Sequence, residues 1–481
     1  MELYRFQELG VRKLAPQRSR LVGDDMGLGK TVTAIKLDHV NRRQHNCDYS
    51  AQTLVCTTKS MMGSMDPQEE GGWAGHFRTW SPHLKVYVID PKNRRGFLQA
   101  IEEKQPNGLP KYQVFIAHWQ VLRFMHEEMW RRNWFHVIAD EVQYIKNPKA
   151  QVTRVFKSMR PYYKTAMSGT WADNKPTDAW GPLNWLWPDQ FRSKKAFEDY
   201  HVIWEEKYNQ KTGKYYKVIK GTANEEELHQ FIAPAYIRRM KTEVLEDFPE
   251  KLPPQNVYVD LDPKQRRAYN QMRDDMLAWI GEHEHEPVAA PVVVSQLIRL
   301  QQFACAYGQL ETVMKNGEPR RVLRLADPSS KLDALMEIVE NSHEPIVVFS
   351  QSKQVLGLLG SRLQSRDISH VLFTGDTPAP DRTRMVREFQ SGAHRVFAAT
   401  IASGGEGITL TRASTAVFVD LAWSPSKNKQ AEDRLHRLGQ KNAVQIIRLV
   451  ARGTIDSRRN ESIDLKWSWL RRLLDPKGPQ I

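Results

Sequence analysis

The stretch GDDMGLGKT, residues 23–31, decides the fold. Its end matches the phosphate-binding loop pattern G-x-x-x-x-G-K-[ST], but Asp24 occupies the first glycine position. The preceding RLVGDD has the pattern of a strand and the following TVTAIKLDHV that of a helix, so the glycines fall at a strand-to-helix turn. Such a turn points backbone N–H groups and a helix dipole at an anion. The loop indicates a nucleotide site, although a glycine-rich helix cap without a ligand has a similar pattern.

Two side chains of the loop and a pair of acidic residues have the chemistry needed to bind a nucleotide together with Mg²⁺. Lys30 would reach the β and γ phosphates, and Thr31 would offer its hydroxyl to Mg²⁺. HVIADE, residues 136–141, ends an apolar strand with two adjacent carboxylates. Asp140 would hold Mg²⁺ through a water, and Glu141 would orient and deprotonate an attacking water. A single carboxylate at a strand end is commonly only solvated, whereas a pair that follows a lysine loop indicates catalysis.

Short apolar runs separated by helical patterns extend through both ends of the chain and predict buried parallel strands. The first group covers residues 53–58, 86–90, 114–119, 135–141 and 165–170. The second group covers residues 345–350, 370–375, 395–400, 416–421 and 444–450. The sequence therefore predicts an α/β protein with two parallel-sheet domains.

The middle of the chain is charged and has few strand signals, which predicts helical insertions and a linker. We expect a first lobe at residues 1–190, the insertions at 191–330, a second lobe at 331–460 and a basic C-terminal helix at 461–481. The segment HEHEP, residues 283–287, could hold a metal, but a solvated loop explains it better.

The composition narrows the classes of protein. Lys and Arg number 70 against 56 Asp and Glu, a formal charge of +14 that favours polyanionic partners without proving one. The three cysteines, Cys47, Cys56 and Cys305, are too few and scattered for a disulfide framework or a zinc site. No long apolar run or secretory signal occurs. We therefore expect an intracellular protein without a membrane span, in cytoplasm, nucleoid or nucleus.

A third motif lies near the C-terminus, in QAEDRLHRLGQ, residues 430–440. Arg434 and Arg437 are three residues apart, so on a helix they would share a face. Two guanidiniums directed at a γ-phosphate would act as arginine fingers. Two arginines on a helix alone usually mean a solvated face, so this interpretation depends on the other motifs.

The ordered motifs resemble the Swi/Snf family of superfamily two helicase-like ATPases, over residues 3 to 460. The final QAEDRLHRLGQ motif is the most family-specific. In this family the position of Asp24 is ordinarily acidic, so the loop is complete by the family standard. The motifs are DMGLGKT, DEVQYIKN, MSGTWADN, IRRMKTEV, VVFSQS, FTGDT, SGGEGITLT and QAEDRLHRLGQ.

The resemblance implies two RecA-like lobes that close on ATP and Mg²⁺ and translocate along duplex DNA. It implies that Gln7 reads adenine and that Lys30, Asp140, Glu141, Arg434 and Arg437 are catalytic. Thr31 and Asp140 would hold the metal. The nucleotide-binding residues would be Gln7, Asp25, Met26, Gly27, Leu28, Gly29, Lys30, Thr31, Gly405 and Gly407.

The chain departs from the family pattern at two positions. Trp171 stands where the family has proline, so coupling between nucleotide and lobe closure differs, or the indole fills a local cavity. Gln143 stands where histidine is more frequent; it can still form hydrogen bonds but cannot transfer a proton as histidine does. The Trp-rich run at residues 171–188 fits core packing better than base stacking.

By resemblance, loops that follow several strands face DNA phosphates without reading sequence. Each of these loop residues is equally well explained as an ordinary surface residue. The residues expected to donate hydrogen bonds to phosphate are Thr57, Lys59, Gln351, Lys353 and Thr400.

The sequence favours an ATP-dependent double-stranded DNA translocase or remodeller, acting as a monomeric minimal motor. A strand-separating DNA or RNA helicase shares the same motifs. A nucleotide-gated DNA clamp without turnover is disfavoured, because all of the catalytic residues are present. An unidentified protein partner is compatible with the sequence, which names neither a pathway nor a direction of movement.

Overall fold

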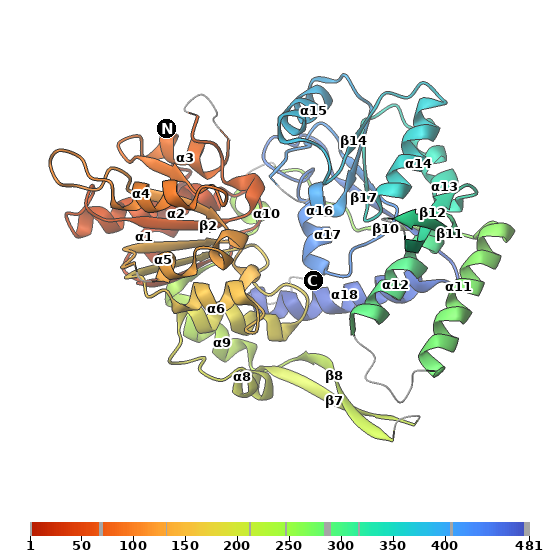
Figure 1. The fold of residues 1–481 in the computed structure, drawn as a ribbon, viewed down its shortest axis with the longest axis horizontal. Helices are drawn as coiled ribbons and strands as arrows, with labels where there is room; N and C mark the ends of the chain where they lie inside the picture. Colours follow the sequence, from red (N-terminus) through yellow and green to blue (C-terminus); the bar gives the residue numbers. More distant parts are fainter. Residues whose placement is uncertain are drawn as a thin grey trace. The chain divides into compact units, whose positions relative to one another are not determined.

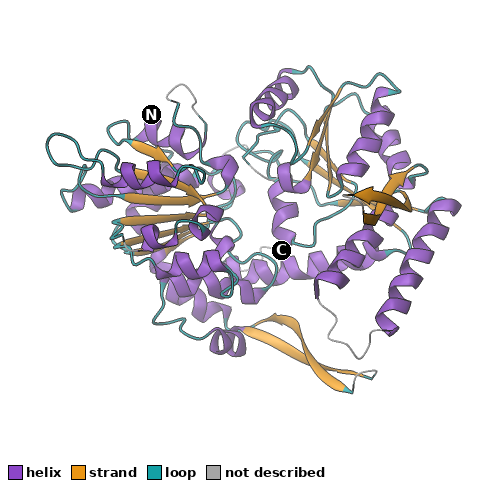
Figure 2. Ribbon diagram, viewed as in Figure 1, coloured by secondary structure: helices purple, strands orange, loops and turns teal. Residues whose placement is uncertain are grey.

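The computed structural model describes residues 2–66, 71–130, 132–210, 213–245, 248–282, 290–315, 318–404 and 407–475. The chain forms two compact units. Unit 1 comprises Met1–Glu205, Val218–Glu246 and Lys466–Ile481, and unit 2 comprises Glu206–Lys217 and Asp247–Leu465. In each unit, helices cover both faces of a parallel sheet (Figures 1 and 2).

Unit 1 is built on a seven-stranded sheet in the order β3-β4-β2-β5-β6-β1-β9, with all pairs parallel. Its strands are β1 (Ser19–Val22), β2 (Thr53–Thr57), β3 (Val86–Val88), β4 (Val114–His118), β5 (His136–Asp140), β6 (Tyr163–Met167) and β9 (Tyr236–Ile237). Its helices include α1 (Arg5–Leu14), α2 (Lys30–Gln44), α3 (Gly72–Trp80), α4 (Arg94–Glu102), α5 (His126–Trp130), α6 (Gln151–Ser158), α7 (Trp180–Leu186), α8 (Lys194–His201), α9 (Glu225–Ile232) and α10 (Lys241–Val244).

Successive side chains along the strands of this sheet pack into two different hydrophobic cores, one on each face. Along β2, Leu54 and Cys56 join one hydrophobic cluster, and Val55 between them joins the other. This follows from the period of two along a strand, which points successive side chains to opposite faces. Both faces are covered, which explains why these strands read as continuous apolar runs.

Unit 2 is built on a six-stranded sheet in the order β10-β17-β16-β13-β15-β14, also parallel throughout. Its strands are β10 (Gln255–Val259), β13 (Ile346–Ser350), β14 (His370–Phe373), β15 (Val396–Thr400), β16 (Thr415–Phe418) and β17 (Gln445–Ala451). Its helices include α11 (Pro263–Glu282), α12 (Ala290–Cys305), α13 (Ser330–Glu340), α14 (Lys353–Gln364), α15 (Ala379–Ser391), α16 (Ile401–Gly404) and α17 (Pro425–Glu432). The expected α/β class is confirmed, and every expected apolar run contains a strand.

The middle segment and the C-terminus differ from the sequence expectation. Residues 191–330 contain β9, β10 and two two-stranded sheets: β7 (Val202–Asn209) with β8 (Lys214–Thr222), and antiparallel β11 (Tyr307–Lys315) with β12 (Glu318–Ala326). Most described side chains of β7 and β8 are at least partly exposed, so these strands lack an apolar run that would reveal them. HEHEP lies outside the described residues.

The C-terminal helix is not a separate tail. Helix α18 (Ile455–Leu474) begins before residue 461, and its final turns contribute Leu470, Leu473 and Leu474 to a core of unit 1. The C-terminal helix therefore anchors in the same unit as the GDDMGLGKT loop.

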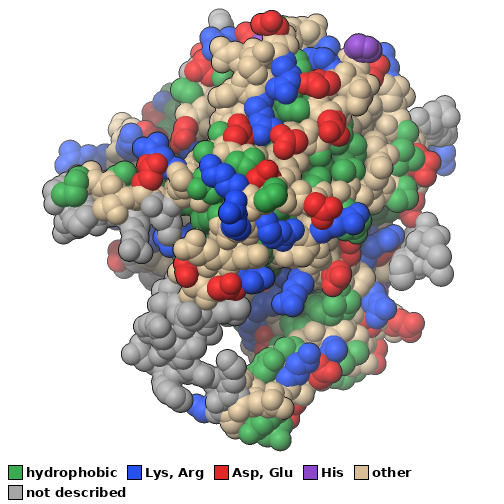
Figure 3. Space-filling view, turned by 90° about the vertical axis from the view of Figure 1, so that its right-hand side faces the viewer, with side chains coloured by type: hydrophobic (Ala, Val, Ile, Leu, Met, Phe, Trp, Pro, Cys, Tyr) green, Lys and Arg blue, Asp and Glu red, His purple; other side chains and the backbone are tan. Residues whose placement is uncertain are grey.

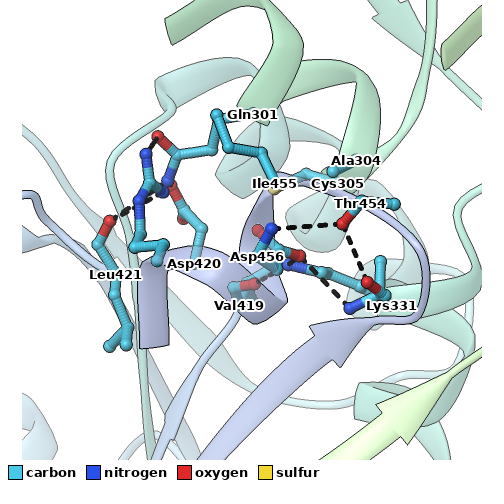
Figure 4. A network of polar contacts seen from close by, with 12 residues as sticks. Gln301, Ala304, Cys305, Lys331, Val419, Asp420, Leu421, Thr454, Ile455 and Asp456 are labelled. Atoms are coloured by element: carbon cyan, nitrogen blue, oxygen red, sulfur yellow. Dashed lines mark hydrogen bonds and ion pairs between the residues drawn. The ribbon is translucent and has the colours of Figure 1, made fainter. Parts of the chain in front are cut away.

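A buried polar network holds together several elements of unit 2 (Figure 4). Lys331 on α13 is fully buried and pairs with Asp456 at 2.6 Å, while its Nζ also donates to the Val419 carbonyl. Burial alone would lower the pKa of Lys331, but the Asp456 carboxylate outweighs it and the pKa is raised. Nearby, Arg459 donates to the Leu421 carbonyl, and Asp420 accepts from Ser350 and Gln301.

Replacing Lys331 by methionine is expected to destabilise unit 2 by about 3 kcal/mol, because it leaves the buried Asp456 charge uncompensated. Urea unfolding followed by circular dichroism measures the change. Lys353→Met provides a matched control, since the Lys353–Asp376 pair is largely exposed and contributes less than about 1 kcal/mol. Equal effects of the two substitutions would contradict a stabilising role for the buried pair.

Candidate functional site

The loop between β1 and α2 in unit 1 depends on glycine at two positions. Gly27 and Gly29 have φ values of 88° and 74°, in the left-handed region that side chains rarely adopt. A Cβ on Gly29 would also lie 2.4 Å from the Gln7 Nε2 atom. Gly29 is the N-cap residue of α2. The loop therefore leads directly into the first turn of this helix, where the backbone N–H groups have no partner within the helix.

Lys30 is held inside this loop. Its Nζ donates to the main-chain oxygens of Asp24 at 3.0 Å and Asp25 at 3.2 Å. Burial lowers the pKa of Lys30, and the nearby carboxylates of Glu141, Asp24, Asp25 and Asp140 offset only part of that effect. A phosphate anion beside Lys30 would further stabilise the charged ammonium.

Asp24, the unusual residue of the loop, faces away from solvent and is fully buried. Arg239, which follows β9, donates from Nε to Asp24 Oδ1 at 2.9 Å and also pairs with Oδ2. Arg238 donates to the Gly169 carbonyl at 2.8 Å and to the Gly23 carbonyl at 2.5 Å. Asp24 therefore anchors the loop to the IRRMK segment, which explains why an acid can stand in the glycine position.

Gln7 is buried against the same loop. Its Nε2 donates to the Leu28 carbonyl at 3.1 Å, and its Oε1 accepts from the Tyr4 N–H at 3.1 Å. Met26 of this loop is half-buried and Leu28 is fully buried. The hydrogen bond to Leu28 places Gln7 beside the residues expected to bind nucleotide.

The two carboxylates lie at the end of β5, as the sequence predicts. Asp140 Oδ2 accepts from Thr57 Oγ1 at 2.7 Å and from the Trp73 indole Nε1 at 2.9 Å. Asp140 Oδ1 receives no hydrogen bond from the described residues, which leaves an oxygen of the kind that Mg²⁺ or its water ligands prefer. The residues present, Asp140 and the Thr31 hydroxyl, fit a magnesium site.

Glu141 adopts an uncommon backbone conformation. Its φ is 53°, which turns the chain sharply after the strand. Glu141 Oε2 accepts from Gln143 Nε2 at 2.5 Å and from Ser168 Oγ at 3.4 Å. Gln143, the departure from the family pattern, therefore positions the carboxylate that it follows.

The second departure, Trp171, is a core residue. Its side chain is fully buried, and its Nε1 donates to the Tyr236 hydroxyl at 3.2 Å. Trp180 and Trp185 of the same Trp-rich run are also buried. The packing interpretation is confirmed for Trp171, Trp180 and Trp185, which all belong to one hydrophobic core of unit 1.

In unit 2, Arg434 and Arg437 do not lie on a helix, contrary to the expectation. Helix α17 ends at Glu432, and the chain continues in turns. Both Nη1 atoms nevertheless approach one acceptor, the Ile408 carbonyl, at 3.5 and 3.4 Å. Gly407, with a φ of 69°, precedes that carbonyl, whereas Gly405 lies outside the described residues.

The expected DNA contacts divide into two groups. Thr57 and Thr400 are buried, and their hydroxyls bond to Asp140 and Ser403 rather than facing solvent, so the structure gives their predicted phosphate contacts no support. The Gln351 amide donates to Gln301 Oε1 at 3.0 Å and to the Leu421 carbonyl at 2.8 Å. Sequence reasoning could not find the Gln351 acceptors, which lie 50 and 70 residues away in the chain.

Lys59 and Lys353 are exposed and remain predicted phosphate contacts. Lys353 pairs with Asp376 at 2.6 Å, in a contact that is open to solvent. On the face drawn in Figure 3, basic and acidic side chains are interspersed.

The fold and these sites define a helicase-like protein with two α/β units, each built on a parallel sheet. A model of the SNF2-related domain matches residues 8–308, and a model of the helicase conserved C-terminal domain matches residues 330–439. The chain belongs to the SNF2-related, or Swi/Snf, family.

Similar proteins carry the same region within longer chains. An uncharacterized ATP-dependent helicase of Mycoplasma genitalium is 25% identical over 95% of this chain and 40% of its own length. The TATA-binding protein-associated factor mot1 of Schizosaccharomyces pombe is 26% identical over 95% of this chain and 26% of its own. The human SWI/SNF-related matrix-associated actin-dependent regulator of chromatin subfamily A member 1 is 26% identical, over 93% and 41%. The chain thus spans less than half of each of these relatives.

A solved structure, the Sulfolobus solfataricus SWI2/SNF2 ATPase core in complex with dsDNA, is 22% identical to this chain. The match covers 99% of this chain and 97% of that one, with a TM-score of 0.43. Among the described residues, no helix is both long and apolar enough to cross a membrane.

Proposed function

We propose that the protein is an ATP-dependent motor that hydrolyses ATP to ADP and phosphate and translocates along double-stranded DNA. The observation that carries this proposal is the loop at residues 23–31, which turns through left-handed glycines into the start of α2 and holds Lys30 within electrostatic reach of Asp140 and Glu141. Membership of the Swi/Snf family, whose relatives named above are described as helicases and chromatin regulators, supports DNA as the partner.

The nucleotide would bind along the loop. Lys30 would exchange its two main-chain acceptors for the β and γ phosphates, and Gln7 would turn its amide from Leu28 to adenine. Thr31 and Asp140 would hold Mg²⁺, which supplies charge neutralisation of the phosphates when bound. Asp25, Met26, Gly27, Leu28 and Gly29 would line the phosphates through the loop backbone.

Glu141 would be the general base. The Gln143 and Ser168 contacts both fall on Oε2, so they orient the carboxylate without removing its charge. A carboxylate held in this way can accept the proton of an attacking water as the water oxygen bonds to the γ-phosphorus, while the bond from the γ-phosphorus to the bridging oxygen breaks and ADP leaves.

Arg434 and Arg437 would supply positive charge from unit 2. Their Nη1 atoms approach the same acceptor, the Ile408 carbonyl, at 3.5 and 3.4 Å, so both would present charge at one place in unit 2. Gly405 and Gly407 would let the backbone come close to the same ligand.

Duplex DNA is expected to stimulate steady-state ATP hydrolysis strongly, because a translocase couples turnover to contact with its track. Rates are measured with no nucleic acid, single-stranded DNA, duplex DNA and duplex RNA. Lys30→Ala serves as the blank, since loss of the phosphate-binding ammonium abolishes hydrolysis. Stimulation by duplex DNA would be followed by a triplex-displacement assay for movement.

Other outcomes assign the protein differently. Preferential stimulation by single strands or RNA would favour a strand-separating helicase, in line with the description of the Mycoplasma relative. Absence of turnover on every substrate would favour a nucleotide-gated clamp or a requirement for a protein partner.

The proposed motor acts inside the cell, where its DNA and ATP are found.

A further inference from the structure

The carboxylate of Asp140 is held by two side chains that lie outside the loop and the acid pair. Trp73, on α3, donates its indole N–H to Asp140 Oδ2 at 2.9 Å. Thr57, the last residue of β2, donates its hydroxyl to the same oxygen at 2.7 Å. Trp119, which follows β4, donates its indole N–H to the Asp140 main-chain oxygen at 3.0 Å. Three separate segments therefore converge on this one residue.

All three donors are buried. Trp73 and Thr57 have no exposed surface, and Trp119 is 1% exposed. Hydrogen bonds from buried donors to an ionised oxygen are stronger than neutral ones, and two of them on one oxygen leave the carboxylate little freedom to rotate. Both contacts fall on Oδ2, so Oδ1 takes no hydrogen bond from the described residues.

We propose that Trp73 and Thr57 are positioning residues that orient the Asp140 carboxylate toward nucleotide-bound Mg²⁺. The inference rests on the proposed function, because it assigns a metal to Asp140. The inference adds two residues to the site. It also gives the buried Thr57 hydroxyl a role, namely to hold the Asp140 carboxylate. Partners of this kind typically change metal affinity by about 10- to 100-fold when removed.

A purely structural role makes a different prediction. A buried indole N–H needs some acceptor, and the Trp73–Asp140 bond could serve only that need. In that case, loss of the bond would lower stability and affect nucleotide binding equally with and without Mg²⁺. Orientation of a metal-binding oxygen would affect only the Mg²⁺-dependent part of binding.

The test uses Trp73→Phe and Thr57→Val, which remove one donor each and keep most of the packed volume. Binding of a fluorescent ADP analogue to the full chain is measured across a series of free Mg²⁺ concentrations. Each substitution is expected to raise the Mg²⁺ concentration for half-maximal effect by about tenfold. Affinity for the analogue without Mg²⁺ should stay within about twofold, because the loop and Lys30 are unchanged. Thr57→Ser, which keeps the hydroxyl, should restore wild-type Mg²⁺ dependence.

Two controls match the chemistry at other places in unit 1. Trp134→Phe removes an equally buried indole whose N–H donates to the Met129 carbonyl at 2.9 Å. Thr153→Val removes a buried hydroxyl that has no hydrogen-bond partner among the described residues. Neither should move the Mg²⁺ dependence.

The outcomes separate this inference from the proposed function. If the wild-type protein binds the analogue with Mg²⁺ but Trp73→Phe and Thr57→Val behave like their controls, the positioning role is wrong and the motor proposal stands. If the wild-type protein binds no nucleotide under any condition, both are wrong. Should Trp73→Phe fail to fold, Thr57→Val and its serine rescue decide the question alone.

Discussion

Glu141→Gln is expected to lower the rate of ATP hydrolysis by about 10³-fold or more while leaving ATP binding intact. The amide keeps the shape of the side chain, which lies within hydrogen-bonding distance of Gln143 and Ser168, but it cannot accept the proton of the attacking water. Lys30, which would carry much of the phosphate affinity, is unaffected. Steady-state hydrolysis and equilibrium binding of a fluorescent ATP analogue measure the two properties separately.

Two other substitutions serve as the inactive and the unaffected controls for Glu141→Gln. Lys30→Ala should abolish hydrolysis, because it removes the phosphate-binding ammonium itself. Glu103→Gln, at a half-exposed acid of unit 1 that pairs with Lys111, should leave both properties unchanged. Normal turnover in Glu141→Gln would overturn the assignment of Glu141 as the base.

Arg437→Ala is expected to lower turnover by about 10³-fold with ATP affinity preserved within a few-fold. The guanidinium would stabilise charge that develops on the γ-phosphate in the transition state, so its loss affects the chemical step more than binding. Single-turnover hydrolysis and ATP-analogue binding provide the measurement. Arg437→Lys should also be slow, since an ammonium lacks the planar fork of donors.

The matched control for Arg437 is Arg366→Ala. Arg366 is a half-exposed arginine of unit 2 that pairs with Glu340, so its loss removes the same charge from the same unit. It should change turnover by less than about twofold, because the pair is open to solvent. An Arg437→Ala variant that loses affinity but hydrolyses bound ATP normally would contradict the arginine-finger role.

Local pattern was sufficient for the apolar strands of the two parallel sheets outside residues 191–330 and for the loop. Runs such as residues 53–58 and 345–350 are apolar on both faces because each sheet is covered on both faces, so their pattern does not depend on the order of strands. The loop at residues 23–31 needs left-handed glycines beside a helix start, and that requirement is written in consecutive residues.

Local pattern failed where the chain turns without an apolar signal. Arg434 and Arg437 follow a helix that ends at Glu432, and the turns include Gly439 with a φ of 97°. The Nη1 atoms of both residues nevertheless approach the Ile408 carbonyl, a contact that comes from the turns and not from a shared helix face.

The sequence by itself determined the class of the fold, the glycine-rich turn before α2, the acid pair at the end of β5 and the family, because each depends on residues close together in the chain. Only the tertiary structure decided that Asp24 pairs with Arg239, and that Thr57 and Trp73 donate hydrogen bonds to Asp140. The physical reason is that these contacts join segments far apart in sequence. They arise from strand order, which places β2 beside β5 and β1 beside β9.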